Sequence, residues 1–576
     1  MTQRSVLRSV RRLLTLLVIL FAAAGPQSAF AQAETAGAAQ ASNAPPAFSD
    51  AAKTAAQSDP VLKAMFEELE RSKTKLKMDG VKAPYFIEYR ITDVDSDSAN
   101  AVFGAPQLDQ RSHVRILRVI VRIGDYKLDS YFRGGLGVAD IAPYENDILA
   151  LREQLWSATD RAYKTAGESY AAKQSLSKQI TLDPTINDFA PAPALVDVEP
   201  LLSLNADGAK WRKAIEDASA LYRKYPEIQS VSATMRFTVS NEYYMNTEGT
   251  VGRRGWSTYT LATIASTQAP DGMTLARSPF DMVRDAKELP SPEQFVAEAE
   301  TALRTLKDLR EAPIVDEEYR GPVLFGSDAA DDVFADLVGS NVLGSKPEPG
   351  ATARTNGDYA SNYKSRVLPD FISVVDDPTV ASFDGRSLTG SYGFDSEGVK
   401  SAPVTVIDKG VLVNYLIGRE PIRDFPVSNG HGRAVPGGVA NPYYGNLFLR
   451  SSRAIPLAEL KKKLVAMCKD ENKEYGYYVE TLGDELMPRL LYRVWVKDGR
   501  EELVRGAVFN ELDTRELRND LIATGDKAEV RNREGNIAAS VVAPAFLFDD
   551  LEVKRADTTK DKLPEYPPPP IAGRAK

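Results

Sequence analysis

Histidine and cysteine are nearly absent from this chain of 576 residues, which contains two histidines, His113 and His431, and one cysteine, Cys468. Because imidazole and thiolate groups are the usual zinc ligands of proteins, a His/Cys zinc site has almost nothing to draw on. A lone thiol cannot form an internal disulfide, so stability must come from the hydrophobic core. With 43% hydrophobic residues over this length, the composition predicts two or more packed domains.

Long apolar segments are also scarce. One run, residues 13–24, is strongly apolar; four arginines precede it, and residues 28–31 (SAFA) after it give a cleavage pattern of small residues. The run is shorter than the roughly 20 residues that a membrane span needs. It predicts a secretory signal peptide over residues 1–31, and therefore an exported protein of the periplasm or the extracellular space, with no membrane span in the mature chain.

Basic residues are fewer than acidic ones, and the difference grows when this peptide is removed. Cleavage takes away four arginines and no acidic residue, which leaves 67 basic and 80 acidic side chains and a formal net charge of −13. An acidic protein repels the phosphates of nucleic acid, so we expect no nucleic-acid partner.

Composition and hydrophobic periodicity divide the mature chain into four parts. They are a flexible leader rich in Ala, Gln and Ser (32–58), a region of mixed helices and antiparallel strands in two parts (59–312, divided into about 59–190 and 200–312), a β-rich C-terminal domain (313–555), and a Pro-rich tail (556–576). Helices and strands are mingled without strict alternation, so the predicted fold class is α+β. The tail is expected to be disordered or to be a docking strip for a partner.

Local signals predict individual elements of the mixed region. Expected strands are 85–91, 101–103, 113–123, 228–239, 242–246 and 258–265, and expected helices are 60–76, 146–173, 209–224 and one capped by Ser291 with Pro292 next. Arg115, Arg118 and Arg122 interrupt the third strand, which indicates a half-exposed sheet face.

The most informative segment is residues 387–416, which reads SLTGSYGFDSEGVKSAPVTVIDKGVLVNYL. Two β-branched runs, 404–407 and 411–416, flank Asp408, Lys409 and Gly410, which predicts a hairpin with a three-residue loop. Residues 371–378 (FISVVDDP) precede this segment, and residues 429–433 (NGHGR) and 446–449 (NLFL) follow it.

In that order and spacing, these pieces resemble the C-terminal half of the TldD/PmbA family, which is related to a zinc-dependent peptidase. The resemblance covers roughly residues 321–554. It implies a β-rich C-terminal domain of TldD/PmbA type and, in the metallopeptidase members, a helix with His-Glu-x-x-x-His and a cysteine in a late loop as zinc ligands.

Placing the family pattern on the helix that begins at Ser327 leaves the ligand positions without ligands. Ala335 and Ser340 stand where the histidines are expected, and Asp336 stands at the glutamate as a candidate catalytic carboxylate. The late loop, residues 527–536 (KAEVRNREGN), has no cysteine. The resemblance therefore implies a chain with no bound metal and no other cofactor.

Several other polar residues are candidates for a site. The resemblance places the loop around His431 beside the cleft, which makes Asn429, His431, Arg433 and Asn446 candidate binding residues, although a solvated loop histidine is the alternative. Asp328, Asp332 and Asp336 recur every four residues; a solvated acidic helix face is the simpler interpretation, and an oxygen-ligated cation the other.

The two remaining scarce residues are expected to be structural. Cys468 falls on the apolar face of a predicted helix, 457–469, together with Leu457, Leu460 and Leu464. His113 opens a strand.

The family resemblance implies pairing, because its zinc-bearing subunits commonly work with related subunits that lack the ligands. We therefore expect an exported, non-catalytic subunit that assembles with a metal-bearing relative or with itself and binds extended peptide substrate. Two alternatives stay open: an active peptidase with a rearranged site that uses Asp336 and His431, and an envelope binding protein for an unrelated ligand.

Overall fold

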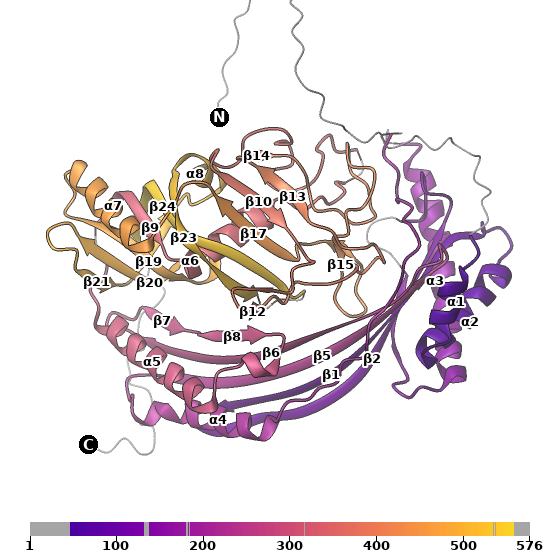
Figure 1. Cartoon of the computed structure of the whole chain (residues 1–576), viewed down its shortest axis with the longest axis horizontal. Coiled ribbons are helices and arrows are strands. Elements are labelled where there is room, and N and C mark those ends of the chain that lie inside the picture. The colour runs from indigo at the N-terminus through magenta and orange to yellow at the C-terminus, as the bar shows by residue number, and fades with distance from the viewer. Residues whose placement is uncertain are drawn as a thin grey trace, which may run out of the picture. The chain divides into compact units, whose positions relative to one another are not determined.

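Two sheets carry the fold of residues 46–557, which the computed structural model describes except for 132–136, 180–182, 184, 316, 349, 534 and 536 (Figure 1). The expected signal peptide, residues 32–45 of the expected leader and the tail from residue 558 onward lie outside these residues. Over the part of the chain described, no helix is both long and apolar enough to cross a membrane. The mixture of helices with largely antiparallel sheets is the α+β fold that the sequence predicts.

The first sheet is built on four long antiparallel strands and has eight strands in all, in the order β3-β2-β1-β5-β6-β4, with β7 and β8 beside β6. The strands are β1 (Pro84–Val102), β2 (Ala105–Ile123), β3 (Val138–Ala142), β4 (Val196–Val198), β5 (Ser230–Asn246), β6 (Val251–Gln268), β7 (Thr274–Arg277) and β8 (Phe280–Val283). Because β1 pairs with β5, the two parts expected within 59–312 share one sheet.

The expectation of two short strands at 85–91 and 101–103 is wrong, because β1 runs through the polar stretch between them. Arginines neutralise the aspartates of that stretch: Arg115 pairs with Asp93 at 2.6 Å, and Arg212 pairs with Asp97 at 2.6 Å. These ion pairs with residues of other segments therefore stabilise the strand conformation of a sequence whose polar residues are typical of a turn. The strands expected at 228–239 and 242–246 are likewise one strand, β5.

Helices pack against both ends of this sheet. They are α1 (Asp50–Ala56), α2 (Pro60–Lys75) and α3 (Ile148–Leu176) at one end, and α4 (Gly208–Ala220), the short helices η1 (Leu221–Arg223) and η2 (Ala286–Glu288), and α5 (Pro292–Glu311) toward the other. The predicted cap of α5 is confirmed, since Ser291 and Gln294 form a reciprocal capping box. The prediction of a flexible leader over residues 32–58 is wrong for its last residues, because Phe48, Ala52 and Ala56 are buried in the core beside α2.

The second sheet has twelve strands, of which nine follow the order β14-β13-β10-β17-β24-β9-β19-β20-β21. They are β9 (Tyr319–Phe325), β10 (Ile372–Asp376), β13 (Val404–Asp408), β14 (Val411–Leu412), β17 (Asn446–Ser451), β18 (Ala454–Ile455), β19 (Tyr475–Leu482), β20 (Pro488–Trp495), β21 (Glu501–Val504), β22 (Ala507–Asn510), β23 (Leu521–Arg533) and β24 (Ala539–Arg555). The other elements of this region are α6 (Ser327–Phe334), η3 (Ala335–Gly339), α7 (Leu457–Asp470), η4 (Asp484–Leu486), α8 (Thr514–Asn519) and the paired strands β11 (Ser382–Phe383) with β12 (Arg386–Ser387) and β15 (Gly432–Arg433) with β16 (Asn441–Pro442).

Two local expectations in this region need a correction. The β13–β14 hairpin forms, but Asp408 pairs with Val411, so the loop has two residues, Lys409 and Gly410, at φ 47° and 79°. Cys468 is buried on α7 as expected, whereas Leu457 is 40% exposed because it opens the helix.

The segment FDSEGV, residues 394–399, joins the second region to the first sheet. Arg254 of β6 donates to the Phe394 carbonyl and, at 2.8 Å, to Ser396 Oγ. Arg90 of β1 donates to the Ser396 carbonyl at 3.0 Å, and Tyr244 of β5 donates to the Glu397 carbonyl at 2.8 Å. We call residues 394–399 the docking turn, because three adjacent strands bind its backbone.

A buried carboxylate fixes the shape of the docking turn. Asp395 accepts from the backbone N–H groups of Glu397, Val399 and Gly432 at 2.8–2.9 Å. Gly398 has φ +74°, and a Cβ there would lie 2.4 Å from the Tyr244 ring, so the turn needs glycine at this position.

The Glu397→Gln substitution should reduce the loss of stability with rising pH. Burial, and then the neighbouring Asp395, raises the pKa of Glu397 to about 8, from 4.5 when unperturbed. A carboxyl with a raised pKa in the folded state contributes stability that is complete below 4.5 and is lost as the pH rises through 8. Glutamine keeps the oxygen that accepts from the Arg419 N–H at 2.6 Å.

The measurement is the urea unfolding free energy of both proteins from pH 5 to pH 9. The wild type should lose more stability than Glu397→Gln as the pH rises. The difference between the two proteins should grow by on the order of 1 kcal/mol per pH unit. The exposed Glu459→Gln is the matched control and should follow the wild type. Parallel profiles for wild type and Glu397→Gln would contradict the assignment.

Candidate functional site

The helix on which the family pattern falls ends in one π-helical turn. α6 continues into η3, and the Ser340 N–H donates to the Ala335 carbonyl at 3.1 Å, five residues earlier. A π turn brings residues at this spacing to the same side of a helix, as two ligands of one metal would require. The side chains do not match this backbone, because Ala335 is a buried methyl group and Ser340 Oγ donates to the Asp336 carbonyl.

Two arginines of β23 cover the acidic face of this helix. Arg533 bonds Asp332 at 2.8 Å and Asp336 at 3.4 Å, and Arg531 pairs with Asp328 and, at 3.6 Å, with Asp332. Asp328 and Asp336 are 44% and 50% exposed, as a solvated face predicts, but all three aspartates also pair with these arginines. These five side chains, which we call the Arg–Asp cluster, belong to the helix and to the late strand where the family pattern expects its cysteine.

Burial sets the ionisation of this region. It raises the pKa of Asp332 and of Asp336, while the Arg533 charge acts in the opposite direction. It lowers the pKa of Arg531 to about 10. Asp331, fully buried and with one oxygen lacking a hydrogen bond, has a pKa well above its ordinary value, again because of burial and then the Asp332 charge.

These residues do not fit a zinc ion. Zinc is held by neutral imidazole, thiolate or carboxylate groups, and here two guanidinium groups already bind the carboxylates. Within the ranges that the structure covers, no group of three His, Cys, Asp or Glu side chains is arranged to hold a metal ion. We therefore derive no metal chemistry for this position.

His431 is fully buried and lies in a hydrogen-bonded structural network. Its Nε2 is 2.9 Å from Asp376 Oδ1, and its Nδ1 is 3.0 Å from the Asn429 carbonyl. The solvated-loop interpretation is wrong, and both ring nitrogens already have partners. Asn429 in turn accepts from the Ile417 N–H at 2.8 Å and donates to the Tyr415 carbonyl at 2.7 Å.

Of the four candidate binding residues, Arg433 lines the cavity described below. Asn446 is buried and donates to the Asp377 and Val380 carbonyls. Arg433 donates to the Tyr444 carbonyl at 3.0 Å and the Ala538 carbonyl at 2.9 Å, and its guanidinium lies over the Tyr392 ring at 4.6 Å.

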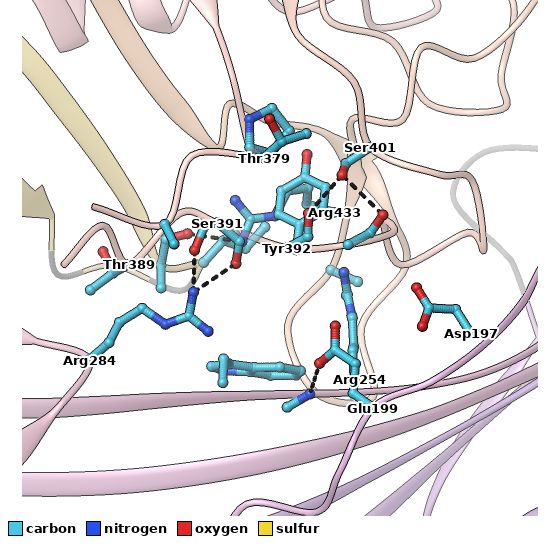
Figure 2. Close-up of a pocket in the computed structure, with 18 of the residues that line it drawn as sticks. Asp197, Glu199, Arg254, Arg284, Thr379, Thr389, Ser391, Tyr392, Ser401 and Arg433 are labelled. Carbon is cyan, nitrogen blue, oxygen red and sulfur yellow. Dashed lines mark hydrogen bonds between the residues drawn. The ribbon is translucent and has the colours of Figure 1, made fainter. Parts of the chain in front are cut away.

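The cavity has a volume of about 430 Å³ and lies where the first sheet meets the segments on either side of the docking turn (Figure 2). Strands β4 and β6 and the end of β8 contribute one wall, and residues 378–401 and 433–436 contribute the other. Its charged lining residues are Asp197, Glu199, Arg254, Arg284, Lys400 and Arg433. Sequence analysis identified Arg433 alone, because no local motif surrounds Asp197, Glu199 or Arg284.

The burial of the arginines affects their electrostatics. Burial lowers the pKa of Arg284, which the Glu199 charge partly offsets, and burial also lowers the pKa of Arg433. Arg254 is bonded to Glu242 at 2.7 Å and 3.0 Å, so its charge is compensated within the protein.

A family model matches the C-terminal part of the chain. Residues 318–555 match the family model described as PmbA/TldA metallopeptidase C-terminal domain. No curated protein matches the sequence significantly. This match agrees with the resemblance inferred from the sequence.

Solved structures share the fold over most of the chain. TldE from Thermococcus kodakarensis has a TM-score of 0.58 at 14% identity, over 85% of this chain and 99% of its own. A candidate modulator of DNA gyrase from Thermotoga maritima has a TM-score of 0.56 at 16% identity, over 85% of this chain and 100% of its own. Another from Bacteroides thetaiotaomicron has a TM-score of 0.55 at 15% identity, over 88% and 99%. At these identities the likeness shows the fold alone.

The Arg533→Met substitution should destabilise the protein more at pH 8 than at pH 4. At pH 8 it leaves Asp332, which is 16% exposed, without its closest cation, at a cost of about 1–3 kcal/mol. At pH 4 the raised carboxyl pKa values leave less negative charge uncompensated. Urea unfolding at the two pH values measures the difference.

The matched control is Arg320→Met, whose side chain is 73% exposed and pairs with Asp550 at 2.8 Å. Such surface pairs contribute little, so it should change stability by less than about 1 kcal/mol at either pH. Equal effects of the two substitutions on the unfolding free energy would show that the Arg–Asp cluster contributes no more to stability than an exposed surface pair.

Proposed function

Because this chain belongs to the TldD/PmbA family, we propose that it is a non-catalytic member that keeps the scaffold of a zinc peptidase without its zinc ligands. One observation carries the proposal: Arg531 and Arg533 bind the carboxylates of the helix on which Ala335 and Ser340 replace the expected histidines. A cationic pair in that position opposes a dication, and Asp336 without a metal-bound water has little to activate.

The proposed role is to bind extended peptide and to assemble with a metal-bearing relative or with a second copy of this chain. Strand β21, at the end of the second sheet, has β20 as its strand partner, so its outer edge is a candidate for main-chain pairing with a peptide. The opposite end is less suitable, because Lys364 and Ser365 already bond to Leu412 of β14.

The site of action is proposed to be the periplasm or the extracellular space. Support comes from the apolar run at residues 13–24 with its preceding arginines and following SAFA pattern. Fractionation of the producing cells and N-terminal sequencing of the mature protein test this point; a chain that retains residues 1–31 in the cytoplasm would contradict it.

An active peptidase that uses Asp336 and His431 finds less support. Both nitrogens of His431 are engaged and its side chain is fully buried, so it has no free position for a substrate or a water. Asp336 bonds to Arg533 instead.

The isolated protein should not cleave unstructured peptides, with or without added zinc. Asp336→Ala should therefore leave the background rate unchanged. The measurement is mass spectrometry of a peptide mixture incubated with the purified chain, and separately with the chain plus a co-exported family member that has an intact His-Glu-x-x-x-His motif.

Cleavage is expected with the relative, and light scattering should then detect a complex. Chelator-sensitive cleavage by the isolated chain that Asp336→Ala abolishes would overturn the proposal.

A further inference from the structure

The cavity beside the docking turn holds cations and anions that the protein does not pair with one another. Arg254 is compensated by Glu242, and Lys400 is exposed at the rim. The remaining charged lining residues are two arginines and two carboxylates. A cavity of about 430 Å³ falls in the size range of small-molecule sites, which are usually largely preformed.

Arg284 and Arg433 form the positive side of the cavity. Arg284 Nη1 donates to the Ser391 carbonyl and hydroxyl, and Arg433 donates to two backbone carbonyls. Within the described chain, neither guanidinium forms an ion pair with a carboxylate. Each has N–H groups left over, and a bound carboxylate would supply the missing negative charge through short, charge-assisted hydrogen bonds.

Asp197 and Glu199 form the negative side. A methyl group placed on Gly393 would lie 3.3 Å from Glu199 Oε1 and 3.4 Å from Asp197 Oδ2, so both oxygens face the same point beside this glycine. Glu199 Oε2 accepts from the Gly255 N–H at 3.0 Å, and neither carboxylate forms an ion pair within the described residues. In Figure 2, Asp197 and Arg284 lie on opposite sides of the cavity, with Glu199 between them.

Aromatic side chains also line the cavity. Trp256 and Tyr392 line the cavity, and the Arg254 guanidinium lies 5.6 Å and 5.7 Å from their ring centroids. Their rings add apolar surface to the lining, and Thr379 and Thr389 add hydroxyl groups.

We propose that this cavity binds a zwitterion of the amino-acid or short-peptide class. The free carboxylate of the ligand bonds to Arg284 and Arg433, and its free ammonium group bonds to Asp197 and Glu199. The proposal rests on the cavity alone, and it holds whether or not the chain assembles with a relative or binds extended peptide at a sheet edge.

Isothermal titration of the full mature chain with a matched set of ligands tests the proposal. The set is trialanine, its N-acetyl form, its C-terminal amide, the doubly blocked form, and free alanine. Trialanine or alanine should bind, and blocking either terminus of trialanine should weaken binding at least about tenfold, because each block removes charge-assisted hydrogen bonds to partly buried side chains.

Two substitutions assign the ends of the ligand. Arg284→Gln should reduce the preference for the free acid over the amide, and Asp197→Asn should reduce the preference for the free amine over the N-acetyl form. Each should leave the other preference in place, which a merely misfolded variant would not do. Arg320→Gln is the control and should keep both preferences, because Arg320 does not line the cavity and pairs with Asp550.

Two results would overturn the proposal. One is equal affinity for trialanine and its doubly blocked form. The other is absence of binding by both trialanine and alanine at millimolar concentration in a protein with a normal unfolding transition. Neither result bears on the peptidase assay with a zinc-bearing relative, so this proposal and the proposed function fail separately.

Discussion

The docking of residues 394–399 onto three strands of the first sheet is the interaction on which the rest of the structure depends. Arg90, Tyr244 and Arg254 satisfy the carbonyls of a turn that is almost wholly buried. Separating the turn from the sheet would leave these buried polar groups without their hydrogen-bond partners, so the contact favours one relative placement of turn and sheet. The cavity follows from it, because Tyr392, Gly393 and Ser401 flank the turn and face Glu199 and Arg254 across the gap.

Ion pairs join the two elements on which the family pattern places zinc ligands. The π turn keeps positions 335 and 340 on one side of the helix, while Arg531 and Arg533 from the late strand bind the aspartates beside them. The helix and β23 are thus held together by ion pairs. These ion pairs connect the two elements without a His or Cys side chain.

Features that depend on neighbouring residues could be predicted from the sequence, whereas those that depend on distant partners could not. The Ser291 cap and the burial of Cys468 follow from spacing within one helix. The polar run in β1 is strand because Arg115 and Arg212 neutralise it from other segments, which no local pattern indicates.

In the candidate site, too, the features that depend on distant partners could not be predicted from the sequence. Asp376 and His431 were both part of recognised motifs, but their pairing at 2.9 Å, which removes His431 from the cleft, comes from the fold. Arg433 was identified through the family pattern, while Arg284 and Glu199 reach the cavity from the other region without any motif around them.

Amide hydrogen exchange of the docking turn tests the central claim most directly. If this contact fixes the two regions in place, the amides of Glu397, Val399 and Gly432 that bond to Asp395 should exchange as slowly as those of β1 and β5, through the same global unfolding. Exchange of the turn that is faster than that of the strands by several orders of magnitude, at a free energy well below that of global unfolding, would contradict the account.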